Sequence, residues 1–185
     1  MAMTPSNMIP LGTQAPDFNL PDTISGKTCN LHDLKGSKAT VIMFICNHCP
    51  FVIHINKAIV NIANTFQNKE VQFIAISSND ADNYPQDGPE QMAMHAKTEK
   101  YPFPYLYDAT QNIAKAYDAA CTPDFYVFNN DLKLTYRGQL DDSRPGNNIE
   151  VTGTDLIHAI NCTVKNTVNN NTQKPSIGCN IKWIK

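Results

Sequence analysis

The chain has 185 residues, 42% of them hydrophobic, which suffices for one packed domain and excludes wholesale disorder. The formal net charge is −2 and the 15 Lys and Arg residues are scattered, so no nucleic-acid partner is indicated. No segment approaches the roughly 18 apolar residues needed to span a bilayer, and the start lacks the pattern of a secretory leader. We therefore expect a single domain, 1–185, in the cytoplasm, without a nucleic-acid or membrane partner.

The first half of the chain predicts a β-α-β unit. Residues 1–36 carry short apolar pieces separated by Gly and Pro, which indicates a small hairpin or capping strands. The uncharged apolar run 40–45 predicts a buried parallel strand. Apolar residues then recur every three or four positions, which predicts a helix over about 47–67. A second buried strand at 71–77 completes the unit, whose connection should be right-handed.

The second half predicts further helices and an antiparallel strand pair. In chain order we expect a loop at 78–89, helices at 90–100 and 110–117 (the latter capped by Thr110), strands at 125–129 and 132–136, a polar loop at 138–153, a helix at about 154–168 with Leu156, Ile160, Val164 and Thr167 on its inner face, and a tail. The turn residues 129–131 predict antiparallel pairing of the two strands. The fold class is α/β, with a central mixed sheet flanked by helices, an N-terminal β extension and a C-terminal tail.

Two cysteines form a C-x-x-C motif where the strand 40–45 ends and the next helix begins. The N–H groups of a first helical turn lack partners within the helix, so they stabilise a thiolate placed before them. We expect Cys46 to be the nucleophile and Cys49, one turn along, to resolve a mixed disulfide formed at Cys46. Pro50 is tolerated in the first turn, where its missing N–H would have no partner.

His48 is the candidate for lowering the pKa of Cys46 further. A drop of roughly two units from about 8.5 requires about 2.7 kcal/mol, whereas an exposed helix terminus supplies roughly 0.3–1 kcal/mol. A positive charge on His48 would supply the remainder. The alternative is that His48 is only a solvated surface residue.

The same cysteines have two other interpretations, a metal site or a pair of inert buried thiols. Around one helical turn, the side chains of Cys46, His48 and Cys49 would point in different directions. The sequence also offers no second C-x-x-C or H-x-x-x-H to complete a set of metal ligands. We therefore predict a redox pair that requires neither a metal nor an organic cofactor.

Five segments carry a resemblance to a known family: APDFNLPD (15–22), LHDLKG (31–36), CNHCPFV (46–52), CTPDFYVF (121–128) and GCNIKW (178–183). They resemble the thioredoxin-like superfamily, and within it the AhpC/TSA redoxin branch with its peroxiredoxin-like members. The resemblance covers most of the chain and implies a thioredoxin-like fold. It also implies that Thr122 precedes a cis Pro123 whose backbone lies beside the C-x-x-C and pairs with an extended substrate, the alternative being an ordinary trans proline that begins a strand.

The resemblance is incomplete at the cysteines. Peroxiredoxins carry P-x-x-x-[T/S]-x-x-C, and laying Cys49 on that cysteine places Cys46 at the Thr and Ile42 at the Pro. The central strand also lacks the buried acid of thioredoxins. Proton transfer from Cys49 would then need water or an acid from the 138–150 loop.

Three further residues are auxiliary candidates. Cys121 precedes Thr122 and is either a third thiol or an apolar lining residue. Cys179, in the tail, is either a resolving thiol or structural, depending on its distance from the pair. Arg144 either orients substrate or belongs to a solvated turn.

Three functions compete. The first is a thiol-disulfide oxidoreductase acting on protein or small-molecule disulfides and thiols, which insulin-disulfide reduction would support. The second is a thiol peroxidase with an antioxidant role, acting on a peroxide through a sulfenic acid and supported by hydroperoxide-dependent loss of thiols. The third is a redox-inert or metal-binding module, supported by stoichiometric metal after anaerobic purification.

Overall fold

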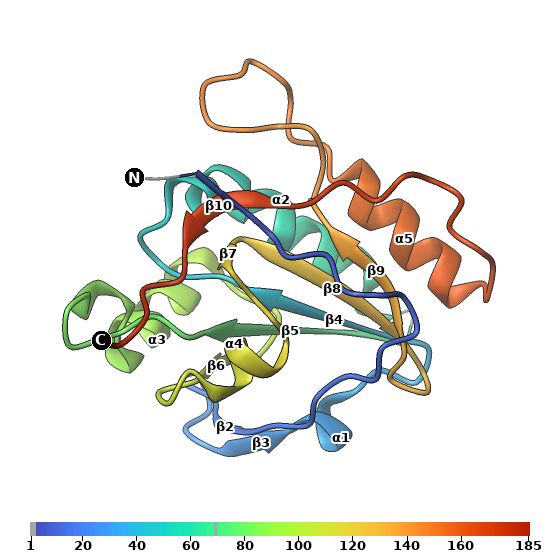
Figure 1. Ribbon diagram of the computed structural model, residues 1–185. Coiled ribbons are helices and arrows are strands. Elements are labelled where there is room, and N and C mark those ends of the chain that lie inside the picture. The colour runs from blue at the N-terminus through green and yellow to red at the C-terminus, as the bar shows by residue number, and fades with distance from the viewer. Residues whose placement is uncertain (1–2, 69) are drawn as a thin grey trace.

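A computed structural model describes residues 3–68 and 70–185, so residues 1, 2 and 69 of the expected domain lie outside the described part. A five-stranded sheet with the order β6-β5-β4-β8-β9 forms its centre (Figure 1). Its strands are β4 (Ala39–Phe44), β5 (Val71–Ser77), β6 (Tyr105–Tyr107), β8 (Asp124–Asn129) and β9 (Leu134–Gly138). Because β4 runs parallel to β5 and antiparallel to β8, the sheet is mixed, as expected.

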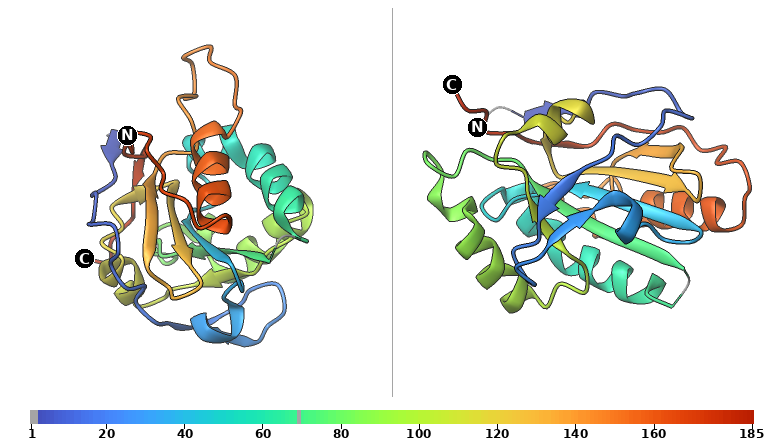
Figure 2. Two further views of the ribbon diagram at one scale, coloured as in Figure 1. Left: turned by 90° about the vertical axis from the view of Figure 1, so that its right-hand side faces the viewer. Right: turned by 90° about the horizontal axis from the view of Figure 1, so that it is seen from below.

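Helices and loops cover both faces of this sheet (Figure 2). One face carries α2 (Pro50–Phe66), α3 (Pro89–Glu99) and α5 (Thr154–Val164), and the other carries α1 (Leu31–Leu34), α4 (Asn112–Ala116) and the N-terminal segment. Along β4, Val41 and Met43 pack on the first face, whereas Ile42 and Phe44 pack on the second. Both sides of β4 are therefore buried, which explains its continuous apolar run.

Two smaller sheets join the ends of the chain to this core. The hairpin of β2 (Asn19–Pro21) and β3 (Thr28–Asn30) confirms the expected N-terminal β extension. In the other sheet, β10 (Ile177–Asn180) lies between β1 (Met3–Pro5) and β7 (Cys121–Thr122), antiparallel to both (Figure 1). The expected tail thus contains a strand.

The helix that follows the C-x-x-C begins later than the sequence suggests. It starts at Pro50 rather than at residue 47, and Cys49 is its N-cap with an extended backbone at φ −70° and ψ 121°. The cause is Pro50, because the ring of a proline disfavours the helical conformation in the residue before it. The cysteine at the N-terminus of α2 is therefore Cys49, and Cys46 lies in the loop before the helix.

Three other boundaries also differ from the expected ones. The N-cap of α4 is Gln111, with φ 62°, rather than Thr110. Strand β9 begins at Leu134, because Leu132 has φ 58° and belongs to the turn. Helix α5 ends at Val164, and Thr167, expected on its inner face, is exposed. The antiparallel pairing of β8 and β9 is confirmed.

None of the described helices is both long and apolar enough to cross a membrane.

Candidate active site

The sulfurs of the C-x-x-C lie at the carboxyl end of β4, against Thr122 of β7. Cys46 is 2% exposed and Cys49 is fully buried. The Cys46 Sγ lies 3.4 Å from the Thr122 Oγ1, and the Cys49 Sγ lies 3.1 Å from the Thr122 carbonyl oxygen. The peptide bond between Thr122 and Pro123 is cis, as expected. One residue of β7 therefore contacts both members of the motif through two different atoms.

The two sulfurs have unequal acidity. A hydrogen bond from the Cys46 thiol lowers the pKa of Cys49 to about 5, against the effect of burial, and the Cys179 thiol and the Val52 backbone N–H lower it further. The same bond, together with burial and the nearby Asp87 carboxylate, raises the pKa of Cys46 well above its usual range. This differs from the expectation of a lowered pKa at Cys46. The main cause is the hydrogen bond between the two sulfurs, and the later start of α2 places the first helical turn at Cys49 rather than at Cys46.

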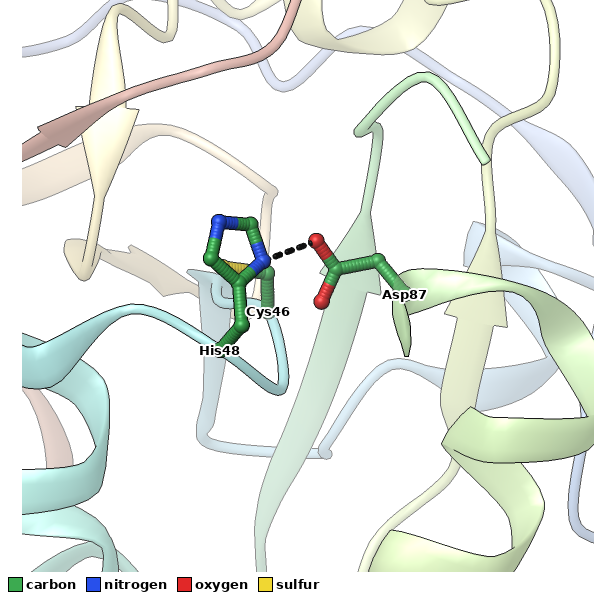
Figure 3. Close-up of side chains that lie close together, drawn as sticks. All are labelled: Cys46, His48 and Asp87. Carbon is green, nitrogen blue, oxygen red and sulfur yellow. Dashed lines mark hydrogen bonds and ion pairs between the residues drawn. The ribbon is translucent and has the colours of Figure 1, made fainter. Parts of the chain in front are cut away.

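His48 is held by a buried acid that the sequence analysis did not single out. Its Nδ1 lies 2.5 Å from Oδ2 of Asp87, which belongs to the 3-10 helix η1 (Pro85–Asp87). Figure 3 shows the His48 ring facing this carboxylate, with the Cys46 side chain behind the ring. The Tyr84 ring stacks on His48 with 5.7 Å between centroids. His48 is therefore a fixed group beside Cys46, which excludes the interpretation as a freely solvated residue.

Asp87 is fixed by further donors. It is fully buried, and besides His48 it accepts hydrogen bonds from the Asn47 backbone N–H and from the Asn79 side chain, both at 2.8 Å. One signal in the sequence could have found it. Because β4 and β5 are parallel, the segments after both strands meet at the same edge of the sheet, so the polar loop 78–89 must lie near the C-x-x-C.

An acid from the 138–150 loop does not reach the site. The buried Asp141 carboxylate instead accepts backbone N–H bonds from Ser143, Thr152 and Gly153, and it thereby holds its own loop together. Asp142 forms an exposed ion pair with Lys174 at 2.7 Å. The buried acid beside the redox pair is Asp87, which comes from the segment after β5.

The residues around Cys46 include potential metal ligands. The Cys46 sulfur, a His48 ring nitrogen and an Asp87 carboxylate oxygen lie within 4.8 Å of one another. Zn²⁺ accepts all three ligand types. However, the His48 Nδ1 and the Asp87 Oδ2 bind each other, so a cation bound at these two atoms would have to replace that bond.

The auxiliary cysteines take different positions. Cys121 is buried, its thiol lies 3.7 Å from the Pro123 carbonyl oxygen, and burial raises its pKa. Cys179 lies in β10 directly opposite Thr122, and its thiol hydrogen-bonds the Cys49 sulfur. The Cys179 thiol therefore contacts the C-x-x-C, whereas the Cys121 thiol hydrogen-bonds the backbone.

Arg144 lies at the edge of the site rather than beside the sulfurs. Its Nη1 donates to the backbone carbonyls of Asp141 and Ser143, and its Nη2 donates to the Gln139 side chain. Together with Pro123 it lines a small pocket beside the cis peptide bond.

Comparison with known proteins agrees with this fold. The chain is 56% identical to a conserved protein from Geobacillus kaustophilus, over 100% of this chain and 97% of that one, with a TM-score of 0.98. It is 46% identical to a hypothetical protein from Sinorhizobium meliloti, over 98% of each chain, with a TM-score of 0.95. The function of neither protein is established by its description.

More distant structures resemble the chain in fold alone. The thioredoxin domain of a thiol-disulfide oxidoreductase from Bacteroides vulgatus is 16% identical over 74% of this chain and 91% of that one, with a TM-score of 0.60. No curated protein sequence matches the chain. The pattern of the AhpC/TSA family matches residues 11–137, which is more than half of the chain and includes the C-x-x-C, Thr122 and Pro123. The chain thus has a thioredoxin-like fold and belongs to the AhpC/TSA family.

Proposed function

We propose that the protein is a thiol-disulfide oxidoreductase in which Cys46 attacks a disulfide of the partner and Cys49 resolves the mixed disulfide. The observation that carries this proposal is the position of both sulfurs on the residue before the cis Pro123, with the Cys46 Sγ 3.4 Å from the Thr122 Oγ1 and the Cys49 Sγ 3.1 Å from the Thr122 carbonyl oxygen. The hydrogen bond between the sulfurs lowers the pKa of Cys49 to about 5. The partner is a protein or a small molecule that contains a disulfide or a thiol. The proposal includes a cytoplasmic location, where all six cysteines would remain thiols as they are here.

The Cys49 thiolate serves as the base, a role for which the central strand offers no carboxylate. When the Cys46 sulfur attacks a disulfide of the partner, its proton passes along the existing hydrogen bond to the Cys49 thiolate. A bond forms between Cys46 and one partner sulfur, the partner's S–S bond breaks, and the other partner sulfur leaves as a thiolate. The Cys49 thiol then donates to the Thr122 carbonyl oxygen, 3.1 Å away. Resolution follows when the Cys49 sulfur attacks Cys46: the Cys46–Cys49 bond forms, the bond between Cys46 and the partner breaks, and the departing partner sulfur takes up the proton that Cys49 loses.

The slight exposure of the sulfurs limits which partner can enter. Cys46 is 2% exposed, so a protein disulfide reaches it only after a local opening, whereas a small disulfide needs a smaller one. Cys46 is assigned as the attacking atom because its sulfur contacts the Thr122 hydroxyl and lies beside the polar side chains of His48 and Asp87.

Substrate trapping tests the assignment of roles. Cys49→Ser should hold its partner as a mixed disulfide at Cys46, whereas Cys46→Ser should hold none, and the unmodified protein should reduce insulin disulfides. A matched control is Cys162→Ser, because Cys162 lies on the outer part of α5 away from the pair. Trapping by Cys46→Ser but not by Cys49→Ser would reverse the roles. A lack of disulfide exchange in every variant would reject the proposed function.

A thiol peroxidase is the second candidate, and one observation favours it. Cys49 is the residue that aligns with the peroxiredoxin cysteine, and it is also the one whose pKa is lowered to about 5. In that case a hydroperoxide oxidises the Cys49 thiolate to a sulfenic acid, and Cys46 then condenses with it and releases water. Stoichiometric loss of two thiols per hydroperoxide, faster than insulin reduction, would favour this function over the first.

A further inference from the structure

We propose that Cys179 is a third redox thiol, which exchanges with the Cys46–Cys49 disulfide to form a Cys49–Cys179 disulfide. This inference depends on the proposed function, because it starts from the disulfide that Cys46 and Cys49 form. It assigns a redox role to the tail strand β10, which lies 130 positions after Cys49 in the sequence.

The first support is the position of Cys179. In the pairing of β10 with β7, Cys179 lies directly opposite Thr122, and Asn180 lies opposite Cys121. Thr122 is the residue whose hydroxyl contacts Cys46 and whose carbonyl contacts Cys49. Strand pairing therefore holds Cys179 at the one residue of β7 that both redox sulfurs already contact.

The second support is the contact between the sulfurs. The side chain of Cys179 hydrogen-bonds the Cys49 sulfur, and the Cys179 backbone N–H also contributes to lowering the pKa of Cys49. Cys179 is 2% exposed and packs in the same core cluster as Cys46 and Cys49. The Cys49 sulfur thus lies between two thiols, Cys46 on the side of the loop and Cys179 on the side of β10.

The third support is the close approach of β10 to β7. A Cβ atom at Gly178 would lie 1.9 Å from the Thr122 carbonyl oxygen, so only glycine fits at this position. Without this close approach the residue after Gly178 could not reach the Cys49 sulfur. The sequence Gly178-Cys179 therefore brings a thiol up to the pair.

The exchange needs no external oxidant or reductant, because one disulfide bond breaks as another forms. Burial and the hydrogen bond to Cys49 raise the pKa of Cys179 to about 12, so Cys179 is a thiol that loses its proton as its sulfur attacks the Cys49 sulfur of the Cys46–Cys49 disulfide. A bond forms between Cys49 and Cys179, the bond between Cys46 and Cys49 breaks, and its electron pair leaves on Cys46. Cys46 takes up the proton that Cys179 has lost. The disulfide then joins Cys49 to Cys179, and the Cys46 thiol is again available to a second partner.

Trypsin separates the two possible disulfides. Cleavage after Lys38, Lys57, Lys165 and Lys182 places Cys46 and Cys49 in one peptide, 39–57, and Cys179 in another, 166–182. A Cys46–Cys49 disulfide therefore stays within one peptide, whereas a Cys49–Cys179 disulfide links two. Mass spectrometry of unreduced digests distinguishes them directly.

The experiment uses the full chain of Cys46→Ser, oxidised with one molar equivalent of diamide and quenched with N-ethylmaleimide. The expected major product is peptide 39–57 linked to peptide 166–182. The link should persist in Cys46→Ser/Cys121→Ser, a control that removes the buried thiol next to Thr122, and should disappear in Cys46→Ser/Cys179→Ser. Recovery of Cys49 as its maleimide adduct, or linked to any other peptide, overturns the proposal.

Two further measurements keep the test decisive. If Cys46→Ser does not fold, the unmodified protein oxidised in the same way should still yield a fraction of the linked peptides, and their absence overturns the proposal. Cys179→Ser should form the disulfide within peptide 39–57. If it does so while no variant yields the linked peptides, the role of Cys179 fails and the proposed function stands. If it forms no disulfide, the proposed function itself fails.

Discussion

His48 and Asp87, which come from different loops, meet beside Cys46 with 2.5 Å between the His48 Nδ1 and the Asp87 Oδ2. The Asp87 carboxylate raises the pKa of Cys46, and a protonated His48 would offset that negative charge. We expect the two residues to act on Cys46 with opposite signs. Sequence reasoning could assign His48 a positive influence on the thiol but could not anticipate that an acid opposes it.

The first prediction is that variants of this pair change the reactivity of Cys46 in opposite directions. Asp87→Asn should lower the pKa of Cys46 and His48→Ala should raise it, each by about one unit, which is about tenfold in thiolate fraction. The measurement is the alkylation rate of peptide 39–57 in a Cys49→Ser background, where Cys46 is its one thiol. Changes of the same sign in both variants would show that the pair acts only through packing.

The second prediction concerns pH. The pKa of Cys49 is about 5 in the folded, reduced protein, compared with about 8.5 for an unfolded cysteine. A lowered folded pKa contributes stability that is complete above the unfolded pKa and is lost as pH falls through the folded pKa. The unfolding free energy of the reduced protein should therefore rise relative to that of the disulfide form between about pH 5 and pH 8.5.

Thiolate absorbance checks the same titration directly. It should appear in the reduced protein with a midpoint near pH 5 and should be lost in Cys49→Ser. A midpoint near the usual cysteine value would contradict the role of the hydrogen bonds from Cys46 and Cys179.

The third prediction concerns a buried ion pair behind β7. Arg137 and Asp124 are both fully buried, with 2.9 Å between the Arg137 Nη2 and the Asp124 Oδ2. Burial raises the pKa of Asp124 to about 6, although the neighbouring guanidinium opposes this effect. Asp124→Asn should lower the free energy of unfolding by about 3–5 kcal/mol, because it leaves a buried charge without its counterion.

The matched control for the ion pair is the double variant Asp124→Asn/Arg137→Met. It removes both charges, so chemical denaturation should show that it recovers part of the loss. An Asp124→Asn variant as stable as the unmodified protein would show that water satisfies the guanidinium.

The fourth prediction tests how β10 covers the sulfurs. In Gly178→Ala, the new Cβ would lie 1.9 Å from the Thr122 carbonyl oxygen, so β10 must move away from β7. The Cys46 and Cys49 thiols should then react with N-ethylmaleimide at least several times faster than in the unmodified protein. Asn180→Ala is the control, because the Asn180 side chain is exposed on the same strand. Equal rates in all three proteins would mean that β10 does not limit access.

The regular elements of the core could be predicted because their signals are local. The run at 40–45 lacks charge since both faces of β4 are covered, and the apolar spacing after it reflects the single buried stripe of α2. Apolar periodicity alone places the start of α2 too early, because it does not include the effect of Pro50. The restriction that proline places on the preceding residue predicts the later start.

The composition of the site was only partly predictable, because it depends on contacts between distant segments. Cys46 and Cys49 are adjacent in sequence and carry a motif, whereas Asp87 reaches them from the loop after β5 and Cys179 from β10. The parallel strands place the loop 78–89 at this edge, which limits the position of Asp87 to a few residues. Nothing in the local sequence of the tail indicates that β10 pairs with β7.

The pairing of β10 with β7 has a consequence for the chain during its synthesis on the ribosome. Cys46, Cys49 and Thr122 are all translated well before residues 177–180, so the nascent protein can form its central sheet while β10 is still missing. The strand that pairs with Thr122 beside the C-x-x-C is thus the last of the described strands to leave the ribosome, and its pairing completes the burial of both sulfurs.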